Sequence, residues 1–263
     1  LESDQFQLYY QPKYRAGDLK IIGAEALIRW FHPTRGEISP GNFISVAEEA
    51  GQISDLTRWV VKRSCEQIAS WRAEGMPVVP IAVNLSPEDF FRDDPVAMVH
   101  SALVASQVDA KLLNLEITES ALMRDTARVS HLLEQLKELG CSVSVDDFGT
   151  GYSSLAYLRR FPLDTLKIDR SFVSDISSDA DAAAICSAII AMGRALGLTV
   201  VAEGVETDQQ LRRLRVDGCD QFQGFLLSRP VPSELFMEQL LAQAPSSDGA
   251  AQTEQKVIKL TQR

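Results

Sequence analysis

The chain has 263 residues, of which 45% are hydrophobic and 24% are charged, so it can bury the core of one full-sized domain. Its formal net charge of -10 argues against sequence-independent binding to duplex nucleic acid or to an anionic membrane surface. No apolar run approaches the roughly 20 residues of a membrane span. Without a signal-peptide pattern or an initial methionine, the sequence predicts a domain cut from a longer protein, either cytoplasmic or the cytoplasmic part of a membrane-anchored protein, with no membrane contact from this segment.

The four cysteines, Cys65, Cys141, Cys186 and Cys219, form no Cys-x-x-Cys pair and have no closely spaced histidine. Neither a structural zinc site nor a redox motif is therefore encoded. We expect buried, reduced thiols in a reducing compartment.

Short apolar runs alternate with stretches of helical periodicity along the chain, which indicates an α/β protein. The predicted strands are Phe6 to Tyr10, Ile21 to Ile28, Ile81 to Leu85, Leu112 to Ile117, Val143 to Val145, Leu166 to Ile168 and Leu198 to Ala202. The predicted helices are Ile53 to Trp71, Pro95 to Ser106, Arg124 to Leu139, Ala180 to Leu196, Asp208 to Val216 and Ser233 to Leu241, with Thr207 and Ser233 placed to open the last two. Periodicity is lost from Ala244 onward, so we expect a barrel domain over residues 1–243 and a mobile tail over 244–263.

Polar residues occur in or just after six of the predicted strands, and this is the most informative pattern in the chain. They are Glu25, Asn84, Glu116, the pair Asp146 and Asp147, Lys167, and Glu203. From Asn84 onward their intervals of about 20 to 36 residues fit repeated strand-helix units, eight of which make a TIM-type (β/α)8 barrel of about 250 residues. The carboxyl ends of barrel strands converge on one face, and gathered carboxylates are costly unless a cation meets them. The sequence therefore predicts a divalent metal site.

Three of these residues leave simpler alternatives open. Glu25 could form a buried ion pair with Arg29, and Lys167 could pair with Asp169, two residues on and facing the same way. Glu119, at the exit of the strand that carries Glu116, could cap the following helix.

The segment from Asp146 to Ser154 is more specific. Two adjacent carboxylates at the end of a strand repel each other unless a cation is bound, although Asp147 could instead cap a helix. Gly149 and Gly151 permit a tight, movable loop after them.

Taken together, seven motifs in this order resemble the EAL-domain family of cyclic di-GMP phosphodiesterases. They are Glu25-Ala26-Leu27-x-Arg29, Asn84-Leu85-Ser86, Glu116-x-Thr118-Glu119, Asp146-Asp147-Phe148-Gly149-Thr150-Gly151, Lys167-Ile168-Asp169, Ala202-Glu203-Gly204-Val205-Glu206 and Gln223-Gly224-Phe225, spread between about Phe6 and Leu241. The resemblance implies a modified TIM barrel that converts cyclic di-GMP to linear 5′-pGpG. It also implies an upstream sensory or diguanylate-cyclase-like (GGDEF-type) domain in a bacterial signalling protein, and a homodimer.

The family's metal ligands carry over to the matching positions of this chain. By resemblance, Glu25, Asn84, Glu116 and Asp146 hold a first ion, and Asp146, Asp147 and Glu203 hold a second. Oxygen ligands with one amide suit Mg²⁺ or Mn²⁺, while Ca²⁺ is expected to inhibit.

Other roles also come from the resemblance alone. Lys167 is expected to contact the attacking water, so that Lys167, Glu203 and Glu25 form the catalytic group. Arg29, Gln11 and Leu27 are the expected substrate contacts, and Gln223 is expected near the second metal. The loop with Gly149 and Thr150 is expected to be regulatory and anchored by Glu206, with Glu119 beside it.

The chain departs little from the family pattern, since Phe225 replaces a usual tyrosine and Leu85 varies the residue after Asn84. No ligand is lost, which favours an active enzyme. The alternative hypothesis is a receptor that binds cyclic di-GMP without hydrolysing it.

Overall fold

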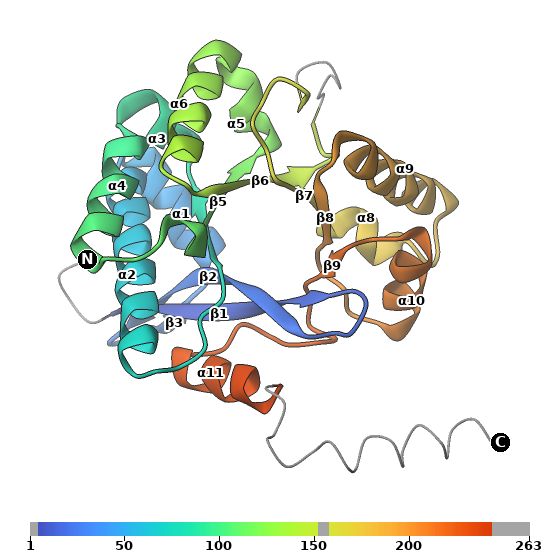
Figure 1. Cartoon of the computed structure of the whole chain (residues 1–263), viewed down its shortest axis with the longest axis horizontal. Helices are drawn as coiled ribbons and strands as arrows, with labels where there is room; N and C mark the ends of the chain where they lie inside the picture. The colour runs from blue at the N-terminus through green and yellow to red at the C-terminus, as the bar shows by residue number, and fades with distance from the viewer. Residues whose placement is uncertain (1–4, 152–157, 244–263) are drawn as a thin grey trace.

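A closed barrel of eight strands forms the centre of the computed structural model, which describes residues 5–151 and 158–243 (Figure 1). Around the barrel the strand order is β1, β9, β8, β7, β6, β5, β4, β2, and the pairing of β1 with β2 closes the ring. Their bounds are β1 Phe6–Arg15, β2 Ile21–His32, β4 Ile81–Leu85, β5 Leu113–Thr118, β6 Ser142–Phe148, β7 Thr165–Ile168, β8 Thr199–Ala202 and β9 Gln221–Phe222. The expectation of a TIM-type barrel is confirmed.

Strand β1 makes this barrel differ from a regular (β/α)8 barrel, in which all strands are parallel. It runs antiparallel to both β2 and β9, whereas the strands from β2 through β4 to β9 pair in parallel. Gln11 lies opposite Glu25, and alternate residues of a strand share a face. Gln11 and Lys13 therefore point into the barrel with Glu25, while Tyr10 packs outward against Phe236.

Helices surround the barrel on its outside, and α11 lies against β1 (Figure 1). Six helices match the predicted ones closely: α2 Ile53–Ala73, α4 Pro95–Ser106, α6 Thr126–Glu138, α9 Ala180–Leu196, α10 Asp208–Asp217 and α11 Ser233–Ala242. Thr207 caps α10 in a capping box, as expected, whereas Ser233 is already helical and Pro232 precedes it without a side-chain cap.

The sequence reading missed shorter elements. They are the strands β3 Gly36–Ile38 and β9 Gln221–Phe222, the helices α1 Pro40–Glu49, α3 Pro87–Arg92, α5 Glu119–Arg124 and α8 Arg170–Asp175, and the 3-10 turn Ala110–Leu112. The expected end of the second strand at Ile28 was also wrong, because its last residues pair with β3. Likewise, the third predicted helix starts later than Arg124, because Asp125 ends α5 and caps α6.

A single hydrophobic core fills the space between the barrel and its helices. All four cysteines are buried within it and unpaired, as expected. Among the residues that the structure describes, no helix is long and apolar enough to cross a membrane.

Candidate metal centre

Three carboxylates from three different strands converge inside one end of the barrel. Glu25 of β2, Glu116 of β5 and Asp146 of β6 offer oxygen atoms that all lie within 4.8 Å of one another. All three side chains are buried, and Glu116 is completely inaccessible to solvent. Magnesium binds oxygen ligands at about 2.0 to 2.1 Å, so a triangle of this size suits one divalent ion.

Lys167 occupies the middle of this cluster. Its Nζ lies 2.6 Å from Glu116 Oε2, 2.6 Å from Glu203 Oε1, 3.0 Å from Asp146 Oδ2 and 3.6 Å from Glu25 Oε2. The alternative pairing with Asp169 is wrong, because the Asp169 carboxylate accepts a hydrogen bond from the backbone N–H of Ser171 at the start of α8. The Lys167 ammonium thus holds together four carboxylates that would otherwise repel one another.

Burial and close charges act against each other on the pKa values of these groups. For Lys167, burial favours the neutral amine, but Asp146, Glu116 and Glu203 outweigh it and raise its pKa well above the usual value. For Glu25, burial is outweighed by Lys167 and Lys13, which lower its pKa. Burial raises the pKa of Glu203 and of Glu116. Lys167 is therefore cationic, and the cluster binds positive charge strongly.

Two buried oxygen atoms at the centre lack a hydrogen-bond donor among the described residues. They are Gln223 Oε1 and Glu203 Oε1, the latter lying beside Lys167 in an ion pair without hydrogen-bond geometry. Among the described residues, four carboxyl groups also face two ammonium groups, those of Lys167 and Lys13. Orphaned oxygens and excess negative charge are what a site for a divalent cation requires, so the residues present fit the expected metal.

Asn84 and Asp147 flank the centre. The side-chain amide of Asn84 donates to Glu25 Oε1 at 2.7 Å, and Asn84 is the neighbour of Glu116 in the sheet. Adjacent residues of a regular strand point to opposite faces, but the pairing of β6 with β7 shifts register between Val145 and Phe148. Within this bulge Asp147 has φ +53° and lines the same cavity as Asn84. The alternative that Asp147 caps a helix concerns the following segment, of which residues 152–157 lie outside the described residues.

The electrostatic environment also acts on Asp147. Partial burial, Asp146 and Asp169 together raise its pKa to about 6. Its partly exposed carboxylate thus lies in a negatively charged environment, which favours a nearby cation.

Gln223 and Gln11 support Glu25. The Gln223 amide donates to Glu25 Oε2 at 2.8 Å and to Gln11 Oε1 at 3.1 Å, and Gln11 in turn donates to the backbone carbonyl of Ser228 at 3.2 Å. Glu25 is therefore held from both sides, because Asn84 binds its other oxygen.

A cavity of about 410 Å³ opens beside the carboxylates. Leu27 and Arg29 line it together with Asn84 and Asp147. Arg29 makes no ion pair with Glu25; its guanidinium lies 3.7 Å from Glu37 and donates to the carbonyl of Ile28. The two expected substrate contacts on β2 thus face a space next to the metal ligands.

Glu119, rather than Glu206, holds the start of the loop after Asp147. The buried Glu119 carboxylate accepts hydrogen bonds from the backbone N–H groups of Gly149 at 2.8 Å and Gly151 at 3.4 Å. Gly149 has φ +102°, and a Cβ there would lie 2.8 Å from the ring of Phe172. The Thr150 hydroxyl donates to the Asp147 carbonyl.

Glu206 is exposed in the structure. Its backbone N–H donates to Gln210 Oε1, and the part of the chain that is described shows no hydrogen bond from its carboxylate to the loop. The later part of the loop, residues 152–157, lies outside the described residues.

Lys13 is a site residue that the sequence reading missed. It is buried on β1, and its Nζ lies 2.5 Å from Glu116 Oε1. The predicted strand ended at Tyr10, because Gln11, Pro12 and Lys13 do not continue the apolar run. The signal that could have found it is alternation, since Gln11 and Lys13 are polar residues two positions apart.

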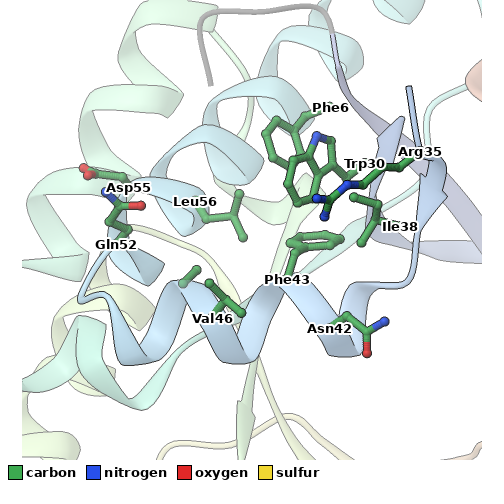
Figure 2. Close-up of a pocket in the computed structure, with 11 residues that line it drawn as sticks. Phe6, Trp30, Arg35, Ile38, Asn42, Phe43, Val46, Gln52, Asp55 and Leu56 are labelled. Carbon is green, nitrogen blue, oxygen red and sulfur yellow. The ribbon is translucent and has the colours of Figure 1, made fainter. Parts of the chain in front are cut away.

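A second cavity, of about 710 Å³, lies away from the carboxylates (Figure 2). It is formed by Phe6 and Trp30, whose rings stack at 5.5 Å, together with Phe43 and the side chain of Arg35. Helix α1 separates the two spaces: Phe43 and Val46 line the second cavity, and Ile44 lines the first. Without metal ligands, the second cavity is no candidate for the chemistry.

The fold and the site define a (β/α)8-type barrel domain with an oxygen-rich cation centre at the carboxyl ends of its strands. The chain belongs to the EAL domain family, whose model matches residues 1–230.

Two curated proteins of Pseudomonas aeruginosa are similar to it. The bifunctional diguanylate cyclase/cyclic di-GMP phosphodiesterase MucR is 48% identical over 242 residues, 92% of this chain and 35% of its own length. The cyclic di-GMP phosphodiesterase NbdA is also 48% identical, over 92% of this chain and 31% of its own length. The chain thus spans about a third of these relatives.

A solved structure, described as the PaMucR phosphodiesterase in complex with c-di-GMP, is also similar. It superposes with a TM-score of 0.85 at 47% identity and covers 88% of this chain and 94% of its own.

Proposed function

We propose that this domain is a metal-dependent phosphodiesterase that hydrolyses cyclic di-GMP to linear 5′-pGpG. The carrying observation is the cluster of three buried carboxylates with the Lys167 ammonium beside them, in a domain whose relatives are named as cyclic di-GMP phosphodiesterases. In the reaction, water adds to one phosphorus, the bond from that phosphorus to a ribose 3′ oxygen breaks, and the 3′ oxygen takes up a proton.

Each ligand has a proposed place. Glu25, Asn84, Glu116 and Asp146 would hold one Mg²⁺ or Mn²⁺, and Asp147 and Glu203 would hold a second that shares Asp146. Two such ions supply a water that ionises near neutral pH and neutralise charge on the phosphodiester.

The chain's own residues do the remaining work. Lys167 donates a hydrogen bond to the attacking water and favours its hydroxide form, because an ammonium beside an oxygen stabilises negative charge. Arg29 binds a substrate phosphate at the cavity beside Asn84, with Leu27 in contact with the nucleotide and Gln11 as a further contact. Gln223 keeps Glu25 in the orientation that coordination needs.

Several features of the whole protein belong to the same proposal. A sensory or GGDEF-type domain precedes this segment and controls it, the active form is a homodimer in the cytoplasm, and Ca²⁺ inhibits because it is larger and less strictly octahedral than Mg²⁺. The relatives' greater length supports the upstream domain.

The deciding experiment is product analysis. Purified protein incubated with cyclic di-GMP and Mg²⁺ or Mn²⁺ should yield pGpG, and the reaction should stop in excess chelator or with Ca²⁺ as sole divalent ion. Glu25→Ala serves as the matched inactive control, with its fold checked by circular dichroism. Tight binding of cyclic di-GMP without product would instead support the receptor hypothesis, and undiminished turnover after confirmed metal removal would refute the metal mechanism.

A further inference from the structure

We propose that Lys13 is a positioning residue that restricts Glu116 to one metal-binding oxygen and thereby makes the centre discriminate against Ca²⁺. The inference rests on the proposed metal-dependent function and assigns a role to a residue outside the ligand set.

The two oxygens of Glu116 face different partners. Oε2 lies 2.6 Å from Lys167, which also contacts Asp146 and Glu203, so this oxygen faces the cluster. Oε1 lies 2.5 Å from Lys13, which comes from the antiparallel strand β1. Glu116 has no solvent exposure and Lys13 is 6% exposed, so water does not compete for this contact.

This arrangement penalises bidentate coordination. An ion bound to both oxygens of Glu116 would come close to the Lys13 ammonium, and two positive charges at that distance in a buried site repel strongly. An ion bound through Oε2 alone would stay on the side of the carboxylate away from Lys13, next to Lys167, which contacts the same oxygen in either binding mode. Lys13 therefore leaves Glu116 as a monodentate ligand.

Monodentate coordination bears on the choice of metal. Mg²⁺ requires six ligands in near-octahedral geometry, whereas Ca²⁺ takes six to eight oxygens and readily accepts both oxygens of one carboxylate. Removing Lys13 would free Oε1 and help Ca²⁺ more than Mg²⁺ or Mn²⁺. Loss of the Lys13 charge changes the affinity for all three ions by the same factor, because each ion is divalent. This factor therefore cancels when the affinity for one ion is divided by the affinity for another.

The test measures metal binding without substrate or turnover. Dissociation constants for Mn²⁺ and Ca²⁺ are determined by calorimetry, with free Mn²⁺ followed by electron paramagnetic resonance, for the wild type and Lys13→Met. The ratio of the Ca²⁺ constant to the Mn²⁺ constant should fall about ten-fold in Lys13→Met, a typical size for the loss of an outer-shell partner. Lys13→Arg keeps a charged donor and should restore the ratio.

A matched control is Lys137→Met, which removes another lysine paired with a carboxylate, Asp164 at 2.7 Å, outside the metal centre. It should leave the ratio unchanged. If Lys13→Met does not fold, Lys13→Gln decides the question, because its neutral amide ends one bond short of the ammonium.

The outcomes separate the two proposals. A Lys13 variant that folds and binds both ions with the wild-type ratio overturns the role of Lys13, even if its affinities change. A wild-type protein that binds neither ion overturns the proposed metal-dependent function instead.

Discussion

Lys167 lies where the positive charge of a metal would also lie, and this makes its role depend on whether metal is present. In the structure its single ammonium contacts four carboxylates within a buried space. Removing one partner from a buried charge cluster costs about 3 to 5 kcal/mol, because the remaining charges lose their compensation. A bound divalent ion would supply that compensation in place of the lysine.

We therefore expect Lys167→Met to lower the thermal stability of the metal-free protein strongly and to lower that of the Mn²⁺-loaded protein much less. Thermal unfolding followed by circular dichroism, in chelator and in saturating Mn²⁺, measures both differences. Equal losses in the two conditions would show that Lys167 acts in the fold independently of the metal. Turnover of the Mn²⁺-loaded Lys167→Met protein should stay low, because the proposed contact between Lys167 and the attacking water is still missing.

At the level of single residues, the carboxylates that come together could be predicted from the sequence, because a carboxylate within an apolar strand is costly and therefore conspicuous. Glu25, Glu116 and Asp146 do converge. Lys13 could not be found in the same way. Its strand has a polar inner face, so the apolar run ends at Tyr10, three residues before Lys13.

Among the elements, the turn from β6 into the following loop is held by α5. Glu119 is the first residue of that helix and accepts the N–H groups of two glycines in the loop. Since Asp147 lies two residues before Gly149, the helix is linked through the chain to one of the proposed metal ligands. The role of Glu206 as an anchor stays a prediction, because residues 152–157 of the loop lie outside the described residues. The contact from Glu119 could not be predicted, because contacts between distant segments are not encoded in local spacing.

We expect Glu119→Gln to raise the Mg²⁺ concentration that half-maximal turnover requires, because an amide oxygen is a poorer acceptor than a carboxylate for the two N–H groups that hold the segment after Asp147. Glu206→Gln is the matched control, an exposed glutamate with the same change in charge. Steady-state rates across a Mg²⁺ titration compare the two. If the Glu119→Gln curve overlays the wild type while the Glu206→Gln curve shifts, the anchor role belongs to Glu206 as the sequence predicted.

The longer helices were predictable and the shorter ones were not. Helices α4 and α9 have the predicted bounds, since their periodicity extends over at least three turns. Helices α1 and α3 each begin with a proline, Pro40 and Pro87, which is a common first helical residue. Helix α3, with six residues, is too short to show a periodic pattern. Helix α1 is as long as the predicted helices α10 and α11, so its length does not explain why it was missed.

At the scale of the whole molecule, the pKa values of the four cysteine thiols reflect their burial in the core. Burial raises the pKa of Cys65 and Cys186 to about 11, and that of Cys141 and Cys219 to about 12. A raised thiol pKa means that the reactive thiolate is scarce at pH 8.

We expect the native protein to react very slowly with a disulfide reagent such as DTNB at pH 8, and all four thiols to react once the chain is unfolded in guanidinium chloride. Absorbance of the released thiolate measures both phases. Rapid reaction of even one cysteine in the native protein would mean that the core opens at that position.

The first and last strands of the barrel pair with each other, so the barrel can close only after the last strand has been synthesised. Tyr14 of β1 pairs with Phe222 of β9, so one edge of the first strand has no partner until more than two hundred further residues have been made. Contacts between such distant parts of a chain form late and slowly. Gln223, which holds Glu25, follows directly after β9. A ribosome-bound chain that ends before this point would carry all six proposed metal ligands on an unclosed barrel, so these ligands come together around Gln223 only in the last stage of the domain's synthesis.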